Sequence, residues 1–138
     1  MTEVSREEAT RYWLGSYGDR AGSSRTIEPI HPNCEFLGWG RTVQGKAGWM
    51  KTREQFLAAF DPLEVTVVDL TCSLEVVSGH ARLAAKHRRS QREVDVFFSF
   101  FVRWHDGQII WMRSLLDTSS LLAQLNLLDL KRWDAIFE

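Results

Sequence analysis

Residues 64–117 alternate apolar and polar side chains with a period of two, which is the spacing of an extended strand. Short polar or glycine-containing breaks interrupt the alternation at 78–79, 90–91 and 105–107. The pattern therefore predicts four long strands, connected as successive antiparallel hairpins. A chain with this much alternation has to fold around a sheet.

The four predicted strands share one apolar face. A two-residue turn at 78–79 and a two-residue loop at 90–91 align the apolar sets, and they place His87 opposite Leu70 and Val94. At 105–107 a three-residue loop with Gly107 left-handed is expected, because it sets Phe100 opposite Met112 and keeps the faces unmixed. The predicted inward set is Val68, Leu70, Cys72, Leu74, Val76, Ala81, Leu83, Ala85, His87, Val94, Val96, Phe98, Phe100, Val102, Trp104, Ile110, Met112, Ser114 and Leu116.

The opposite face is also partly apolar. It is predicted to carry Val65, Val67, Phe97, Phe101, Trp111 and Leu115 among the charged residues Asp69, Asp95, Arg103 and Arg113. Large apolar groups on a second face need a cover. If helices cover the first face, a second copy of the chain is the expected cover, and the charged residues can pair across a homodimer.

Helices are expected on either side of these strands. Residues 6–17 and 45–60 have helical spacing, Pro62 closes the second helix, and 26–30 form one or two further turns. Residues 34–37 are a short strand, and Asp117 is placed to cap a final helix over 118–128. The predicted fold class is α+β, a curved antiparallel sheet wrapped around N-terminal helices.

Length and charge limit the class of protein. The chain has 138 residues, enough for one domain, and its 17 Lys and Arg residues balance its 18 Asp and Glu residues. We therefore expect neither a nucleic-acid nor a membrane partner, and a cytoplasmic location. Cys34 and Cys72 have neither a zinc nor a disulfide spacing and are expected to be small buried hydrophobes.

The order of these elements resembles the SnoaL-like branch of the nuclear transport factor 2-like superfamily. The resemblance is carried by IHPN before a strand, by GKAGWMKTREQFLAAF, and by FFVRWHDGQIIWMRSLLDTSSLLAQLNL. The resemblance covers residues 5–127. We expect a single domain over 1–138, in which 128–138 form a C-terminal extension. The superfamily includes ketosteroid isomerases, polyketide cyclases and limonene-epoxide hydrolases, and the resemblance implies an α+β cone around an apolar pocket.

The residues that carry chemistry in those relatives are mostly replaced here. By the resemblance, a strand Asp or His falls on Phe100, a last-strand Asp falls on Ser114, and the general-base Asp of ketosteroid isomerases falls near Gly38. Asp117 is kept, but the predicted faces point it away from the pocket.

An apolar pocket would be lined by inward side chains of both layers. The predicted lining is Trp13, Tyr17, Phe36, Trp49, Phe56, Phe60, Leu83, Phe98, Phe100, Met112 and Ser114. His87 is the one inward imidazole, and Tyr17 is a phenol on the first helix, where ketosteroid isomerases keep an oxyanion-stabilising tyrosine. These two are the candidate catalytic groups. His87 and Ser114 are expected about 13 Å apart, too far for a dyad.

Other motifs predict no site. The basic run at 86–92 spans a hairpin tip, the glycines match no phosphate-binding loop, and the histidines lack metal-ligand spacing. No cofactor and no metal are expected. Two functions stay open: a protein that binds a small hydrophobic, cyclic molecule without acid–base chemistry, or an isomerase, cyclase, dehydratase or epoxide hydrolase that uses Tyr17 or His87 in a nonstandard role.

Overall fold

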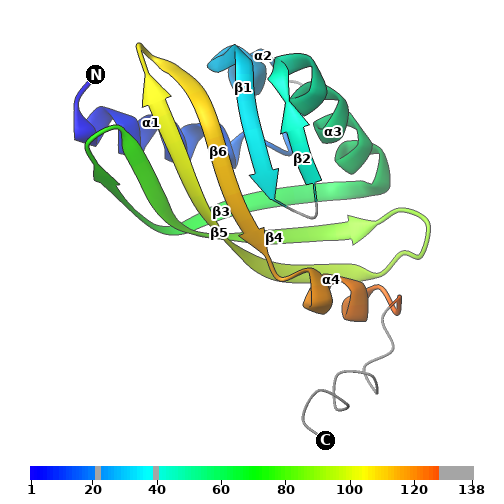
Figure 1. The fold of residues 1–138 in the computed structure, drawn as a ribbon. Coiled ribbons are helices and arrows are strands. Elements are labelled where there is room, and N and C mark those ends of the chain that lie inside the picture. The colour runs from blue at the N-terminus through cyan, green and yellow to red at the C-terminus, as the bar shows by residue number, and fades with distance from the viewer. Residues whose placement is uncertain (21–22, 39–40, 128–138) are drawn as a thin grey trace, which may run out of the picture.

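The computed structural model describes residues 1–20, 23–38 and 41–127, and its ribbon is drawn in Figure 1. The expected C-terminal extension at 128–138 lies outside the described residues. Helix α1 (Glu3–Gly15) begins in a capping box, in which Thr2 and Ser5 bond each other's backbone N–H. It starts and ends earlier than the predicted 6–17. Helix α3 (Gly45–Ala59) matches the predicted 45–60 closely, whereas helix α2 (Ser23–Ile27) lies three residues earlier than the turns predicted at 26–30.

Six strands form one sheet. They are β1 (Ile30–Gly38), β2 (Arg41–Gln44), β3 (Phe60–Ser73), β4 (Val76–His87), β5 (Glu93–His105) and β6 (Gln108–Leu116), in the spatial order β2-β1-β6-β5-β4-β3. The expected antiparallel sheet is in fact mixed, because β1 pairs with β6 in parallel, and β2 was not predicted. The α+β class is confirmed.

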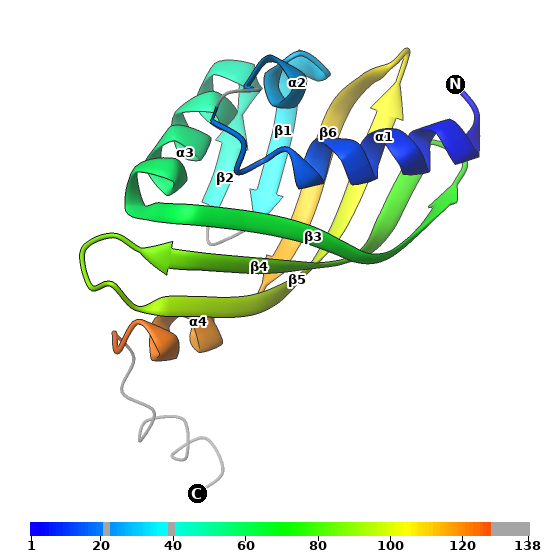
Figure 2. The same cartoon turned by 180° about the vertical axis from the view of Figure 1, so that it is seen from behind.

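Helices α1, α2 and α3 lie on one side of the curved sheet. Seen from behind in Figure 2, α1 crosses in front of the strands and packs against β3, while α3 packs against β1. The buried core fills the space between these layers, and Phe100 and Ile109 are among its fully buried side chains. None of the described helices has the length and apolar content needed to cross a membrane.

Charged side chains of α1 bond the outer edge of β3. Glu7 accepts from the Cys72 N–H at 3.0 Å, and Glu3 accepts from the Leu74 N–H at 3.1 Å. Arg11 donates to the Val67 carbonyl at 3.3 Å. These residues follow one another at i, i+4 and i+8 and lie on one side of the helix. Glu7 and Arg11 satisfy backbone groups of a long edge strand that would otherwise be open to pairing with another chain, and Glu3 bonds the turn that follows it.

The first hairpin turns earlier than predicted. Its turn is at Leu74 and Glu75, with Leu74 left-handed at φ 56°, whereas 78–79 lie inside β4. The expected pairing of Leu70 with His87 is therefore wrong, and Leu70 lies opposite Gly79. A turn that places a leucine at positive φ carries no glycine or asparagine signal in the sequence.

A bulge in β3 exchanges the faces of this strand. The register shifts between Val67 and Asp69, so Val65 and Val67 are buried on the helix side, while Val68 is exposed. The prediction had these three residues reversed. Leu70 and Cys72, on the far side of the bulge, pack against the core as predicted. A single extra residue flips every side chain beyond it, and strict alternation cannot reveal its position.

The last hairpin closes through a two-residue turn of Asp106 and Gly107, both at positive φ, and not through the predicted three-residue loop. Gly107 is left-handed as expected. A two-residue turn alone would mix the faces, but Ile110 is an extra residue between the paired positions Ile109 and Trp111. Ile109 is consequently buried in place of Ile110.

The middle hairpin keeps its faces although its register is wrong. Leu83 lies opposite Val96 and not Phe98, a displacement of two residues along the strand. An even displacement leaves every side chain on its own face. The predicted inward set of β5 is buried throughout, from Val94 to Trp104.

The remaining local predictions concern the end of the chain and the thiols. Asp117 caps helix α4 (Thr118–Gln124) by accepting from the Ser120 N–H at 3.0 Å, as predicted. Cys34 is fully buried, and burial raises the pKa of its thiol to about 12. Cys72 is half-buried, and both cysteines are free thiols.

Candidate functional site

A small apolar cavity lies between the helices and the sheet. Its volume is about 80 Å³, and it is half-enclosed. The lining residues come from α1, the turn that follows it, α3 and five of the strands: Trp13, Leu14, Tyr17, Phe36, Leu37, Gly38, Val43, Trp49, Thr52, Phe56, Val65, Phe98, Met112 and Ser114. Every one of these described side chains is neutral. Typical ligand pockets measure roughly 300–1,000 Å³, so a ligand here must be small or must displace side chains.

Four aromatic rings form one wall of the cavity. Trp49 of α3 is at their centre, with ring centroids 6.0 Å from Trp13, 5.7 Å from Phe36 and 6.1 Å from Tyr17. The Tyr17 ring meets Trp49 edge-on, whereas the Trp13 ring is stacked on it. Trp13 is fixed by its indole N–H, which donates to the Thr26 carbonyl at 2.8 Å. The wall is therefore held by packing and by a buried hydrogen bond.

Gly38 and Ser114 form the opposite part of the lining, where β1 and β6 run in parallel. They are paired in register, and a Cβ on Gly38 would lie 2.2 Å from the Ser114 carbonyl oxygen. Gly38 also has φ +144°, a conformation that favours glycine. No larger residue, and so no carboxylate, fits at this position without a backbone shift.

Tyr17 is the cavity's phenol. Burial raises its pKa above the usual value, and the positive charge of Arg53 opposes this rise without cancelling it. The Arg53 guanidinium lies 5.9 Å from the centre of the Tyr17 ring, and its Nε donates to the Tyr17 carbonyl at 3.0 Å. The phenol is thus a neutral hydrogen-bond donor at physiological pH. It is a poor base, since deprotonation in this site is disfavoured.

Thr52 and Ser114 are the other hydroxyl groups in the lining. Thr52 donates to the Gly48 carbonyl of its own helix at 3.1 Å, and Ser114 is buried. Neither is near an imidazole of the described residues that could activate it, because no histidine lines the cavity. The lining can orient a ligand through hydroxyl groups, but its own side chains supply no base.

The structure brings together most of the predicted lining. Trp13, Tyr17, Phe36, Trp49, Phe56, Phe98, Met112 and Ser114 line the cavity, whereas Phe60, Leu83 and Phe100 lie elsewhere in the core. The prediction missed Leu14, Leu37, Gly38, Val43, Thr52 and Val65. Val65 was missed because of the β3 bulge, and Val43 because the short β2 strand has no periodic signal.

His87 lies at the tip of the β4–β5 hairpin and not at the cavity. Its Nδ1 is 2.8 Å from the Ser90 hydroxyl, and its ring centroid is 5.3 Å from that of Phe60. Ser114 of β6 lies opposite Phe100 of β5, and Phe100 lies opposite Gly79 of β4. Gly79 is eight positions from His87 along β4, so Ser114 and His87 are eight positions apart along the strand direction. His87 and Ser114 were expected to be four positions apart, so their actual separation is larger than predicted and again excludes a direct contact.

The remaining predicted features lie away from the cavity. Arg88 of the basic run pairs with Asp61 at 3.2 Å. Within the described part of the chain, no group of three or more His, Cys, Asp or Glu side chains could hold a metal ion. Asp117 is exposed and occupied with capping α4.

No protein-family model matches this sequence. No curated protein matches it either. Solved structures do match over nearly the whole chain. One of them, assigned as a SnoaL-like polyketide cyclase, is from Jannaschia sp. CCS1 and matches with a TM-score of 0.81 at 21% identity. The match covers 92% of this chain and 95% of that one.

Two further matches differ in assigned chemistry. A Catenulispora acidiphila protein with a ketosteroid isomerase-like fold, solved in complex with trimethylamine, has a TM-score of 0.78 at 15% identity and coverage of 88% and 94%. An LEH-like epoxide hydrolase from M. tuberculosis has a TM-score of 0.76 at 12% identity and coverage of 90% and 91%.

The chain has a nuclear transport factor 2-like fold. This fold is shared by proteins assigned as cyclases, isomerases and hydrolases. At identities of 12–21% the likeness establishes the nuclear transport factor 2-like fold alone. Function has to be argued from the cavity of this chain.

Proposed function

We propose that the protein binds a small hydrophobic, cyclic molecule in this cavity and that it does so without acid–base chemistry. The observation that carries the proposal is the neutral lining, in which aromatic and aliphatic side chains surround a few hydroxyl groups. General acid–base catalysis needs a group whose pKa lies near the working pH. Among the described lining residues Tyr17 is the one phenol, and no carboxylate or imidazole accompanies it; burial moves the pKa of Tyr17 away from that range.

The supporting physics is that of a preformed apolar site. A molecule that enters the cavity removes apolar surface from water and gains contacts with rings already held in place. The small free volume favours a single ring over a fused polycycle. Trp13 and Trp49 are in the wall, so their fluorescence reports an occupant.

A titration with benzyl alcohol, followed by tryptophan emission, tests the proposal. One saturable site per chain is expected, with a change in emission. The proposal fails if emission stays linear in ligand concentration up to the solubility limit and calorimetry detects no heat of binding.

The second candidate function is catalysis with Tyr17 as a hydrogen-bond donor to a ligand carbonyl, in an isomerase, cyclase, dehydratase or epoxide hydrolase. The position of the phenol in the lining favours it over a role for His87. Turnover that falls about 100-fold in Tyr17→Phe and is unchanged in His87→Ala would establish this alternative.

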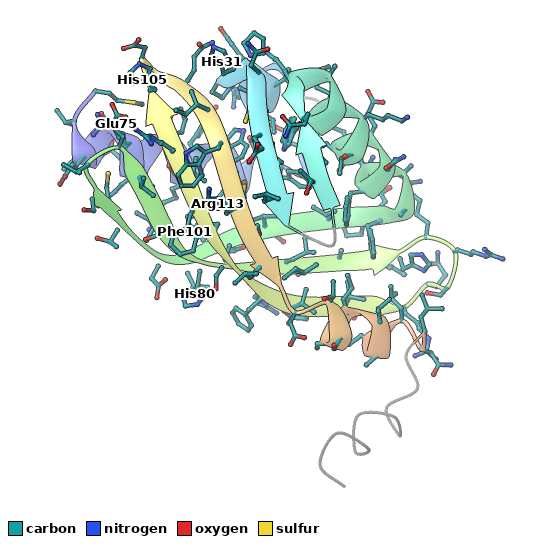
Figure 3. The ribbon with its side chains drawn as sticks, viewed as in Figure 1. His31, Glu75, His80, Phe101, His105 and Arg113 are labelled. Atoms are coloured by element: carbon teal, nitrogen blue, oxygen red, sulfur yellow. The ribbon has the colours of Figure 1, made fainter. Side chains whose placement is uncertain are left out.

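We also propose that the protein is a homodimer through the outer face of its sheet. Phe97, Phe101 and Leu115 are 56%, 44% and 74% exposed there. Figure 3 shows Phe101 and Arg113 on this face, away from the helices. Arg113 lies 4.8 Å above the Trp111 ring, which adds a charged rim to an apolar patch that a second copy can match.

A further inference from the structure

A buried positive charge lies directly behind the aromatic wall. Arg53 of α3 is only 5% exposed. Its Nε donates to the Tyr17 carbonyl at 3.0 Å and its Nη2 to the Asp19 carbonyl at 2.9 Å. Both acceptors are neutral. Within the described part of the chain, no carboxylate is within 4.0 Å of this guanidinium.

The charge is one ring away from the cavity. The guanidinium lies 5.9 Å from the centre of the Tyr17 ring, and that ring is part of the lining. The charged neighbours of Arg53 are Asp19, Arg20 and Glu54, all of them exposed. Solvent screens these exposed charges strongly, whereas a buried charge is screened much less. Arg53 is therefore the least screened of these charges, and its own field at the Tyr17 ring is positive.

This field decides which charge a ligand can carry. An aromatic wall by itself attracts ammonium groups through the ring faces. Here, however, none of the described lining residues is a carboxylate that could offset the repulsion between a cation and Arg53. An acidic oxygen meets the opposite condition, because the positive charge attracts it.

We propose that the cavity selects its ligand by charge and takes a small ring that bears a carboxylate, phenol or enol oxygen, in preference to a cation of the same size. This inference rests on the proposed function, because it names the class of molecule that the cavity binds. Arg53 acts on the ligand through space and positions the Tyr17 backbone, without itself lining the cavity.

Three probes of matched size test the inference on the unmodified protein. Benzoate, benzyl alcohol and benzylammonium share one ring and differ in charge. Calorimetric titrations at neutral pH and low salt should show benzoate binding about tenfold or more tightly than benzylammonium, with benzyl alcohol between them. Added salt should narrow the difference only slightly, because the charge is buried.

The outcomes distinguish a failure of charge selection from a failure of the proposed binding function. Binding of benzyl alcohol with equal affinities for the two ions, or with the cation favoured, overturns charge selection and leaves the binding function standing. Binding of none of the three probes overturns both.

Variants assign the selectivity to its residue. Arg53→Met should bring the benzoate-to-benzylammonium affinity ratio close to one, and Arg53→Lys should largely keep it. A purely structural role would weaken all three probes together and leave the ratio unchanged. Lys51→Met, which removes an equal charge from an exposed position of the same helix, is the matched control and should not alter the ratio. If Arg53→Met does not fold, titration of the three probes against wild type and Arg53→Lys still tests charge selection.

Discussion

The backbone of Gly79 lies against the carbonyl of Asp69, so that a Cβ on Gly79 would be 2.1 Å from this oxygen. The close approach lies next to the β3 bulge, where the register shifts between Val67 and Asp69 and Leu70 pairs with Gly79. Gly79 is therefore required at this point of the sheet, although it was predicted as a turn residue.

Gly79→Ala should destabilise the protein by roughly 1–3 kcal/mol or more, because backbone atoms have to move. Gly15→Ala is the matched control, since a Cβ added to Gly15 would meet no atom within 4 Å. That control should be neutral or stabilise by up to about 1 kcal/mol. Urea unfolding of both variants measures the difference, and similar free energies of unfolding would contradict the bulge geometry.

Phe98 and Phe100 provide a second matched pair. Both are buried on the inner face of β5, but Phe98 lines the cavity and Phe100 is surrounded by core. Phe100→Ala should cost about 3–5 kcal/mol, and Phe98→Ala should cost less, because part of its surface is already unpacked. Denaturant melts test this order. A loss under about 1 kcal/mol at Phe100 would mean that the inner face is misassigned.

Tyr17 should make stability fall at alkaline pH. Its folded-state pKa is raised by burial, so the folded protein keeps the proton that the unfolded chain loses above about pH 10. The contribution is complete below the unfolded pKa and is lost as pH rises towards the folded pKa, at up to roughly 1.4 kcal/mol per pH unit. Thermal melts of wild type should decline more steeply above about pH 10 than those of Tyr17→Phe. Parallel declines would show that the phenol is not buried.

The outer sheet face should control assembly. Phe101→Asp places a charge in the apolar patch and should convert a dimer into a monomer of 15.9 kDa. Leu74→Asp is the control, because Leu74 is 79% exposed in the β3–β4 turn. Light scattering at micromolar concentration measures the mass. A wild-type monomer, or dissociation by Leu74→Asp alone, contradicts the proposed face.

The sequence predicts strand identity and face better than register. On β5 every inward residue was identified, because its alternation is unbroken and the register error at Leu83 is an even number of residues. The bulges at Val68 and Ile110 could not be predicted, since the extra residue in each strand is apolar like the residue before it. The β3 bulge explains why Val65 lines the cavity although it was predicted to lie on the outer face.

The cavity was predictable where it rests on helix and strand periodicity. Trp13, Trp49 and Phe98 follow from the faces of their elements. Gly38 enters the lining through a close backbone contact with Ser114, which depends on the parallel pairing of β1 with β6. Arg53 has helical spacing on the buried side of α3, yet a charged residue gives no sign in the sequence that two backbone carbonyls will receive it.

The most direct test of the account is whether filling the cavity abolishes binding. Val43→Phe adds a ring at a half-buried lining position, and Val68→Phe makes the same change at a residue that is 56% exposed on the outer face. Calorimetric titration of benzyl alcohol should give one site in wild type and Val68→Phe, and an affinity about tenfold or more lower in folded Val43→Phe. Equal affinities in the three proteins would show that the molecule binds elsewhere.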